Sequence, residues 1–262
     1  MGVSLSIIAL NRGSKISWKA LRDDLAGSWP RLPAAQQVQK KENTLSFDIG
    51  SMSVAMGMMP APIPRDSWVL PERQTWIWPD AATALEDHRT HLILTVFGDE
   101  SALAEARLLT MVTTSVLATC GNPCGVSWGG AGLLIAPDVF LEVARETLPD
   151  DLPLHLWLAV TMAGNDDGTF SGFTRGMDDF GLMEFITENA TDPPQELCQR
   201  FYGLGDYLLT NGPVIKDGDT IGESMSERIR VLFCDSPFGH ENQVMRLDYA
   251  AKKGRSWFGL RS

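Results

Sequence analysis

The segment Leu92–Cys120, which reads LILTVFGDESALAEARLLTMVTTSVLATC, decides the fold of the first half of the chain. Its first six residues form a continuous apolar run, which is typical of a strand covered on both faces. From Glu100 onward, apolar and small residues recur at helical spacing, and Asp99 stands where a helix cap is expected. We therefore predict a strand and then a helix, which ends at Gly121 in the left-handed conformation just before Pro123.

Strand and helix patterns alternate on the N-terminal side of this segment as well. The predicted elements are a strand at Leu5–Leu10, a helix at Ser17–Ser28 capped by Ser17, strands at Thr44–Ile49 and Ser51–Met59, an extended connector at Pro60–Pro64, and a helix at Ala81–Arg89. This order of elements is compatible with a split βαβ unit of the ferredoxin-like type.

A second alternation follows, and it contains a hairpin turn at Asn165–Gly168. Asn, Asp and Gly tolerate the positive φ angles that such turns require. The elements predicted around it are strands at Gly132–Ala136, Leu154–Met162, Thr169–Arg175, Ile229–Phe233 and Val244–Tyr249, with helices at Asp138–Glu146 and Pro194–Leu209.

We therefore predict an α+β fold of two ferredoxin-like or split βαβ-type halves, with antiparallel or mixed sheets packed against helices. A six-residue pattern, H-L-x-L-x-V, occurs at His91–Val96 and again at His155–Val160. This short internal repeat, or echo, agrees with two related halves. The expected division is an N-terminal half at 1–131, an acidic C-terminal half at 132–250 and a basic tail at 251–262.

The charge of the 262 residues is −11 and is unevenly distributed. Residues 1–131 hold 12 acidic and 11 basic residues, whereas residues 138–248 hold 21 acidic and seven basic residues, a net charge of −14. A negatively charged surface attracts cationic partners and repels nucleic acid. A protein that binds nucleic acid needs surplus Lys and Arg to neutralise the phosphates. The alternative is an acidic surface that only keeps the protein soluble.

The composition also bears on the compartment. Four cysteines are too few for a disulfide scaffold, which favours free thiols in a reducing cytoplasm. The N-terminal residues lack the pattern of a signal peptide, and no run of eighteen uncharged apolar residues occurs. We expect a soluble cytoplasmic protein without a membrane partner.

The sequence GVSWG around Ser127 has the G-x-S-x-G spacing of a hydrolase nucleophile. Asp235 and His240 follow in the chain order of a catalytic triad. In α/β-hydrolases, however, this motif connects a strand to a helix, whereas here a helix precedes it and a glycine-rich stretch follows. A strand edge or turn is the favoured interpretation, and a serine hydrolase using Ser127 stays an alternative.

Metal chemistry is weakly indicated. His88 and His91 have H-x-x-H spacing, but the predicted helix ends between them. The methionines of Met52–Met59 are better explained by packing or by a contact strand than by copper binding. Asp217–Thr220 has too few carboxylates for a calcium loop and indicates a tight turn. We expect neither a metal nor a cofactor.

The densest acidic stretch comprises Asp166 and Asp167 in the hairpin, followed by Asp178, Asp179 and Glu184. Paired carboxylates can act as acid–base catalysts or metal ligands. Because these residues lie in turn-like sequence that is expected to be exposed, a surface that faces a partner is favoured. We predict these five residues as partner-binding residues.

Residues 174–184, which read TRGMDDFGLME, fit the signature T-x-G-[LM]-x-x-F-G-x-x-E. Together with the helix through Tyr207, the DGDTIG turn at 217–222 and Leu247–Tyr249, they resemble the bacterial domain-of-unknown-function family DUF4261 over about residues 170–250. The residues of this signature are structural in kind: glycine turns and a core aromatic. The resemblance implies no catalytic residues, and it suggests stand-alone cytoplasmic proteins, some of them encoded among secretion and toxin genes.

These observations lead to three functional hypotheses. The first is a non-enzymatic binding protein, most concretely an immunity protein that neutralises a co-encoded toxin by pressing its acidic face on a basic protein surface. The second is the serine hydrolase. The third is an adaptor or structural component of a bacterial secretion apparatus, such as type VI secretion, with Met52–Met59 and the Trp257–Phe258 tail as contact surfaces.

Overall fold

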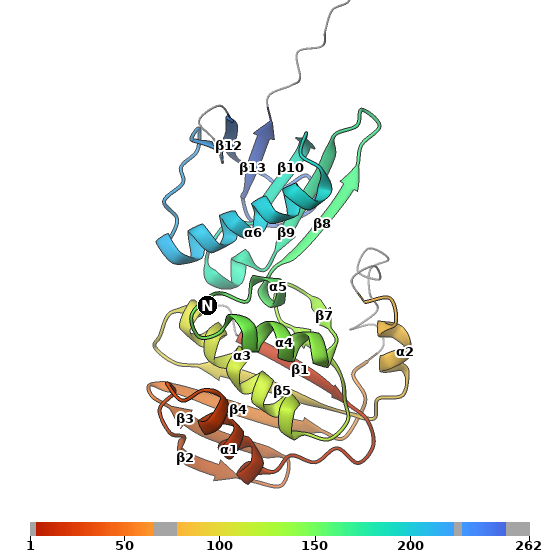
Figure 1. The fold of residues 1–262 in the computed structure, drawn as a ribbon, viewed down its shortest axis with the longest axis vertical. Coiled ribbons are helices and arrows are strands. Elements are labelled where there is room, and N and C mark those ends of the chain that lie inside the picture. The colour runs from red at the N-terminus through yellow and green to blue at the C-terminus, as the bar shows by residue number, and fades with distance from the viewer. Residues whose placement is uncertain (1–3, 65–77, 223–226, 250–262) are drawn as a thin grey trace, which may run out of the picture.

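Two β-sheets, one in each of two lobes, organise the computed structural model, which describes residues 4–64, 78–222 and 227–249 (Figure 1). The first sheet has seven strands in the order β2-β3-β4-β5-β1-β6-β7, and the second has six in the order β11-β12-β13-β10-β9-β8. Helices pack against both sheets, so the predicted α+β class is confirmed. The predicted basic tail at 251–262 lies outside the described residues.

The first lobe is an antiparallel sheet covered by helices. Its strands are β1 (Ser4–Leu10), β2 (Gln36–Lys40), β3 (Thr44–Ile49), β4 (Met52–Met59), β5 (Thr90–Phe97), β6 (Pro123–Trp128) and β7 (Leu133–Ile135). Its helices are α1 (Trp18–Ser28), α2 (Ala81–Glu86), α3 (Ala102–Thr119) and α4 (Pro137–Thr147). The central order β4-β5-β1-β6, with α1 and α3 as the two crossovers, is that of a split βαβ unit.

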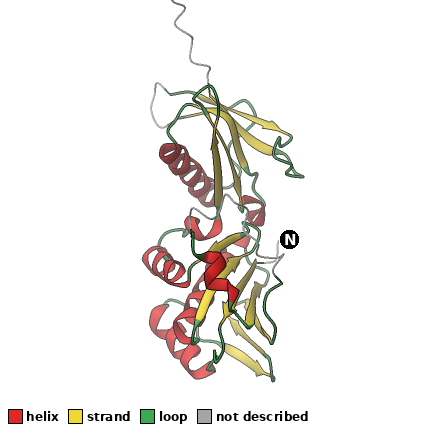
Figure 2. Ribbon diagram, turned by 90° about the vertical axis from the view of Figure 1, so that its right-hand side faces the viewer, coloured by secondary structure: helices red, strands yellow, loops and turns green. Residues whose placement is uncertain are grey.

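Alternation along β1 explains how both faces of this sheet are covered. Ile8 and Leu10 belong to the main core under α1 and α3, whereas Ala9 packs with Leu85 of α2 and Cys124 of β6. Figure 2 shows the larger helices gathered on one side of the sheet.

Helix α3 is buried around much of its circumference, which places polar side chains in the core. Thr110 and Thr114 donate to the carbonyls four residues before them, at 2.8 and 2.7 Å. Ser115 accepts the indole N–H of Trp29 at 3.1 Å. Each of these buried polar groups is therefore hydrogen-bonded.

The ends of α3 differ from the prediction in detail. The cap is Ser101, whose hydroxyl accepts from the N–H of Ala104, and not Asp99. After the helix, the positive φ falls on Asn122 (57°) and not on Gly121. Ser17 caps α1 as predicted, accepting from the N–H of Ala20.

The second lobe is a mixed sheet covered on one face by one long helix. Its strands are β8 (Ala159–Gly164), β9 (Phe170–Arg175), β10 (Phe185–Ala190), β11 (Thr220–Ile221), β12 (Ile229–Cys234) and β13 (Val244–Tyr249). Strands β8, β9 and β10 form an antiparallel meander, and β13 pairs with β10 in parallel. Helix α6 (Pro194–Asn211) lies across one face of this sheet (Figures 1 and 2). It buries Leu197, Phe201, Leu204 and Leu208 in the core of the second lobe.

The two lobes divide later in the chain than the predicted boundary at 131/132. β7 pairs with β6, and Phe140 and Ala144 of α4 enter the first core, so residues beyond 132 complete the first lobe. Residues 154–162, predicted as one strand, instead form the short helix α5 (Leu154–Trp157) and then β8. The echo at His155–Val160 therefore does not repeat the single strand β5.

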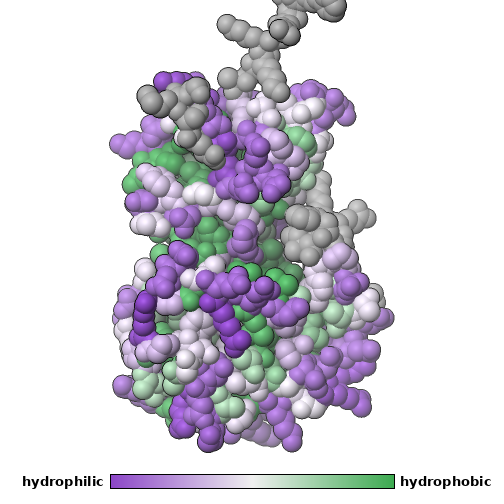
Figure 3. Space-filling model, viewed as in Figure 1, coloured by the Kyte–Doolittle hydropathy of each residue, from purple (hydrophilic) through white to green (hydrophobic). Residues whose placement is uncertain are grey.

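Trp157 joins the lobes at this junction. Its side chain is fully buried in the first core, and its indole N–H donates to Thr110 Oγ1 of α3 at 2.8 Å. Its ring packs against Phe180 of the second lobe, with the ring centroids 5.6 Å apart. In the view of Figure 3, apolar residues reach the surface at the narrow waist between the lobes.

Candidate functional site

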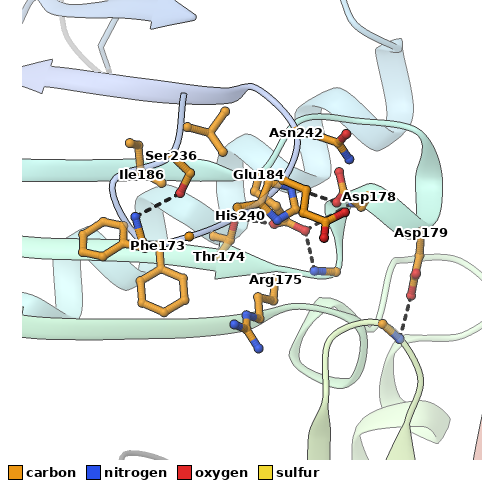
Figure 4. Close-up of a pocket in the computed structure, with 16 residues that line it drawn as sticks. Phe173, Thr174, Arg175, Asp178, Asp179, Glu184, Ile186, Ser236, His240 and Asn242 are labelled. Atoms are coloured by element: carbon orange, nitrogen blue, oxygen red, sulfur yellow. Dashed lines mark hydrogen bonds and ion pairs between the residues drawn. The ribbon is translucent and has the colours of Figure 1, made fainter. Parts of the chain in front are cut away.

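A cavity of about 380 Å³ opens at the junction of the lobes. Its walls come from the end of β9, the turn η2 (Met177–Phe180), the start of β10, the loop between β12 and β13, and Gly130 of the first lobe. Figure 4 shows the residues that line it. The ionisable residues among them are Arg175, Asp178, Asp179, Glu184, His240 and Glu241.

The buried carboxylate of Glu184 shapes the floor of the cavity. Only 3% of this residue is exposed. One of its oxygens accepts from Thr174 Oγ1 at 2.7 Å, and the other accepts from the N–H groups of Gly176 and Asp178 at 2.7 and 3.2 Å. Glu184 therefore ties the turn after β9 to the start of β10.

Two glycines allow this turn. Gly176 has φ 122°, and a Cβ there would overlap the carbonyl oxygen of Trp157. Gly181 has φ 70° and ends the turn in the left-handed conformation. The signature residues Thr174, Gly176, Gly181 and Glu184 thus all serve one clasped turn, which presents Asp178 and Asp179.

Asp179 connects the turn to the first lobe. Its Oδ2 accepts from the N–H of Gly130, in the connection between β6 and β7, at 3.1 Å. A Cβ at Gly130 would overlap this carboxylate, so the close approach requires glycine.

Asp178 faces the opposite wall of the cavity. Its Oδ2 lies 2.9 Å from Nε2 of His240, and the two side chains are 38% and 26% exposed. In the same loop as His240, Phe238 stacks on Phe173 of β9 with ring centroids 4.9 Å apart, which holds the loop against the sheet.

Burial shifts the pKa values of two carboxyl groups of the cavity, those of Glu184 and Asp179. Desolvation raises the pKa of Glu184, and hydrogen bonds from Thr174, Asp178 and Gly176 oppose the rise. Desolvation likewise raises the pKa of Asp179, against the lowering effect of the bond from Gly130. Because these two carboxylates already accept backbone hydrogen bonds, the acids best placed to meet a ligand are the exposed Glu241 and the exposed Asp178, which also contacts His240.

The structure separates the five predicted contact residues into two groups. Asp166 and Asp167 lie exposed at the tip of the β8–β9 hairpin, where Asp167 accepts from Thr169. Asp178, Asp179 and Glu184 lie at the other end of β9. Since β9 has six residues, its ends are about 17 Å apart. Glu184, expected in exposed sequence, is instead buried.

The other motifs of the sequence lie elsewhere. Ser127 belongs to β6, pairs with Ile7 and Leu134, and does not line the cavity. The carboxylate that contacts His240 is Asp178 and not Asp235.

His88 and His91 are buried and hold the proline-rich connector. His88 Nε2 accepts from the N–H of Ile63 at 2.7 Å, and His91 Nδ1 lies 2.8 Å from the carbonyl of Ala61.

The acidic turn and the methionines also have structural roles. Asp217 and Asp219 accept backbone N–H groups around the tight turn at Gly218. Met56 is buried in the first core, whereas Met59 is exposed.

Sequence reasoning missed three parts of the cavity: Gly130, Arg175 and residues 236–244, which comprise most of the β12–β13 loop and the first residue of β13. It considered His240 only as a member of a triad. The glycine-rich stretch 129–132 was the one available signal, because close backbone approach commonly requires glycine.

Within residues 4–64, 78–222 and 227–249, no group of three or more His, Cys, Asp or Glu side chains is placed to hold a metal ion. In the same described ranges, no helix has the length and apolar character needed to cross a bilayer.

Residues 173–248 match the family described as Domain of unknown function (DUF4261), which confirms the resemblance of the C-terminal part. The match runs from the second half of β9 into β13, and it includes both the clasped turn and the loop that carries His240. Comparison with curated proteins found no match, and neither did comparison with solved structures.

Proposed function

We propose that this protein is a non-enzymatic, cytoplasmic binding protein whose junction cavity receives a cationic side chain of a partner protein. The proposal rests on one observation: the cavity presents two exposed acids, Asp178 and Glu241, whereas the carboxylates of Asp179 and Glu184 already accept structural hydrogen bonds. Such a site offers charge and shape to an ammonium or guanidinium group.

The concrete form of the proposal is an immunity protein that neutralises a co-encoded bacterial toxin. Residues 138–248 carry a net charge of −14, so their field attracts a basic protein and speeds its association. Toxins that act on nucleic acid are basic near their active sites because they bind phosphate. An acidic partner that covers such a surface blocks the substrate.

The proposal is tested with the purified products of the genes that flank this one. Their association with the full chain is measured by biolayer interferometry over a salt series, and growth is measured when both proteins are co-expressed. Reversing Asp178 and Glu241 to Lys is expected to slow association about tenfold at low salt and to abolish growth rescue.

Reversal of Asp166 and Asp167 to Lys is the matched control, because it makes the same charge change at the far end of β9. Equal slowing by both pairs would mean that net charge acts without the cavity. Binding without growth rescue would contradict the immunity role and leave the binding site supported. If no flanking product binds, or if the cavity pair leaves the association rate unchanged, the proposal is wrong.

A further inference from the structure

His240 contacts one of the two exposed acids to which the proposed function assigns the binding of a cation. Its Nε2 lies 2.9 Å from Oδ2 of Asp178 (Figure 4). This nitrogen is shielded from solvent, and it makes no hydrogen bond to any residue that the structure describes. The contact is therefore mainly electrostatic, and it is an ion pair only while the imidazole carries a proton.

Five other ionisable residues line the cavity around His240, and the first lobe adds the uncharged Gly130. They are four acids and one base: Asp178 and Asp179 of η2, Glu184 directly before β10, Glu241 of the same loop as His240, and Arg175 of β9. Histidine is the side chain that ordinarily changes its charge between pH 5 and 8. His240 is therefore the group through which pH near neutrality acts on this cavity.

We propose that the proton of His240 regulates the cavity, because it competes with the partner's cation for the carboxylate of Asp178. When His240 is protonated, it neutralises Asp178 and adds a positive charge to the cavity, so a cationic side chain binds weakly. When His240 is neutral, the charge of Asp178 is left to the partner. This inference rests on the proposed function, since it requires that the cavity receives a cation.

Linkage fixes the sign of the pH dependence. Uptake of a proton by His240 and binding of a cation oppose each other, and each weakens the other by the same factor. Raising the pH removes the competing proton, so the affinity for the cation rises with pH until His240 is fully neutral. Arg175 also lines the cavity, but its charge is constant over this range, so it changes the affinity without making it depend on pH.

The buried carboxyl groups of the cavity act in the same direction as His240, so their effect has to be separated from that of the histidine. Burial raises the pKa of Asp179 and that of Glu184. Protonation of either group at acid pH removes negative charge, which weakens the binding of a cation as well. Substitutions of His240 leave this contribution in place, so they identify the part of the pH dependence that belongs to the histidine.

Binding of a small guanidinium probe by the full chain tests the proposal. The isotope-labelled protein is titrated with N-acetylarginine methylamide at pH 6 and at pH 8, and the amide NMR signals of Gly130 and Gly176 report binding at the cavity. The citrulline analogue, which has nearly the same shape and no charge, is the control ligand. Wild type is expected to bind the arginine probe about fivefold or more tightly at pH 8 than at pH 6.

Two variants fix the histidine position in one charge state each. His240→Gln is neutral at both pH values and is expected to bind the probe with nearly equal affinity at both. His240→Lys is positive at both and is expected to bind weakly throughout. His155→Gln, on α5 and outside the cavity, is the matched control and is expected to keep the pH dependence of wild type. Thermal melting by circular dichroism checks that each variant folds.

The outcomes separate this inference from the proposed function. If the probe binds equally at both pH values, or if His240→Gln keeps the full pH dependence, the inference is overturned and the cation site stands. If the arginine probe binds at neither pH, or if the citrulline analogue binds as tightly, the cation site itself is wrong and the inference fails with it. Should His240→Gln not fold, His240→Asn answers the same question, because it too is neutral at both pH values.

Discussion

At the scale of single residues, Glu184 shows how burial changes the role of a carboxylate from surface charge to structural hydrogen-bond acceptor. Its neighbours in sequence, Asp178 and Asp179, made an acidic run that indicated an exposed surface. In the structure, the Glu184 carboxylate instead accepts hydrogen bonds from a side chain and two backbone groups. Sequence alone does not distinguish these cases, because the partners of a buried acid depend on how the chain turns after β9.

Replacing Glu184 with Ala is expected to lower the free energy of unfolding by about 3 kcal/mol, because buried donors of the turn lose their acceptor. Urea denaturation monitored by tryptophan fluorescence measures the change. Glu188→Ala, on the strand β10 that follows Glu184 directly, is the matched control, since Glu188 is exposed and its oxygen lies 3.7 Å from Arg246. A loss at position 184 no larger than that at 188 would contradict the role of the clasp.

The same carboxylate gives the stability a pH dependence of defined sign. Burial raises the pKa of Glu184 above its ordinary value of 4.5, so near that pH the folded state holds a proton that the unfolded state releases. This contribution to stability is full below pH 4.5 and is lost as pH rises through the raised pKa. Glu184→Gln keeps an acceptor but cannot titrate, so its denaturation curves are expected to lack this component.

At the scale of elements, the turn between β9 and β10 depends on two glycines for different reasons. Gly181→Ala is expected to cost about 1 kcal/mol, because only the left-handed backbone is penalised and the space around it is open. Gly176→Ala is expected to cost clearly more, since its Cβ would also meet the carbonyl of Trp157. Chemical denaturation of both variants compares the costs, and equal losses would rule out the steric contribution.

Elements with a strong periodic pattern were predictable, and elements defined by their neighbours were not. Helices α3 and α6 and strand β5 follow from apolar spacing. β2 was missed because all five of its residues are exposed, so no apolar alternation marks it. The turn of helix α5 was read as strand because an apolar run such as Leu154–Trp157 suits either structure.

At the scale of the molecule, Trp157 couples the unfolding of the two lobes. Trp157→Ala is expected to lower stability by about 4 kcal/mol. It is also expected to split one unfolding transition into two, because the residue packs in the first core and against Phe180 of the second lobe. Differential scanning calorimetry resolves the transitions.

Trp29→Ala is the control for this coupling. Trp29 is also buried and also donates its indole N–H to an α3 hydroxyl, but it lies wholly in the first lobe. It is expected to lower stability by a similar amount while the transitions stay coupled. Splitting in both variants would show that general destabilisation, and not the junction, separates the lobes.

Neither the lobe boundary nor the cavity could be predicted from the sequence, and the reason is the same for both. Composition and charge change near residue 132, whereas the core of the first lobe continues through α4 to Trp157. The cavity brings Gly130 together with the β12–β13 loop, which lies more than a hundred residues further along the chain. Only the pairing of strands and the packing of helices determine such neighbours.

The clasped turn implies that the signature of this domain contains two kinds of position. The first kind depends only on the domain itself, and it comprises Thr174, Gly181 and Glu184. Thr174 and Glu184 have their hydrogen-bond partners within the domain, and Gly181 is required by the backbone conformation of the turn. Gly176 and Phe180 depend also on Trp157, which is packed in the core of the preceding lobe. Over evolution, a change of neighbouring lobe would therefore relax selection on the second kind while it preserved the first.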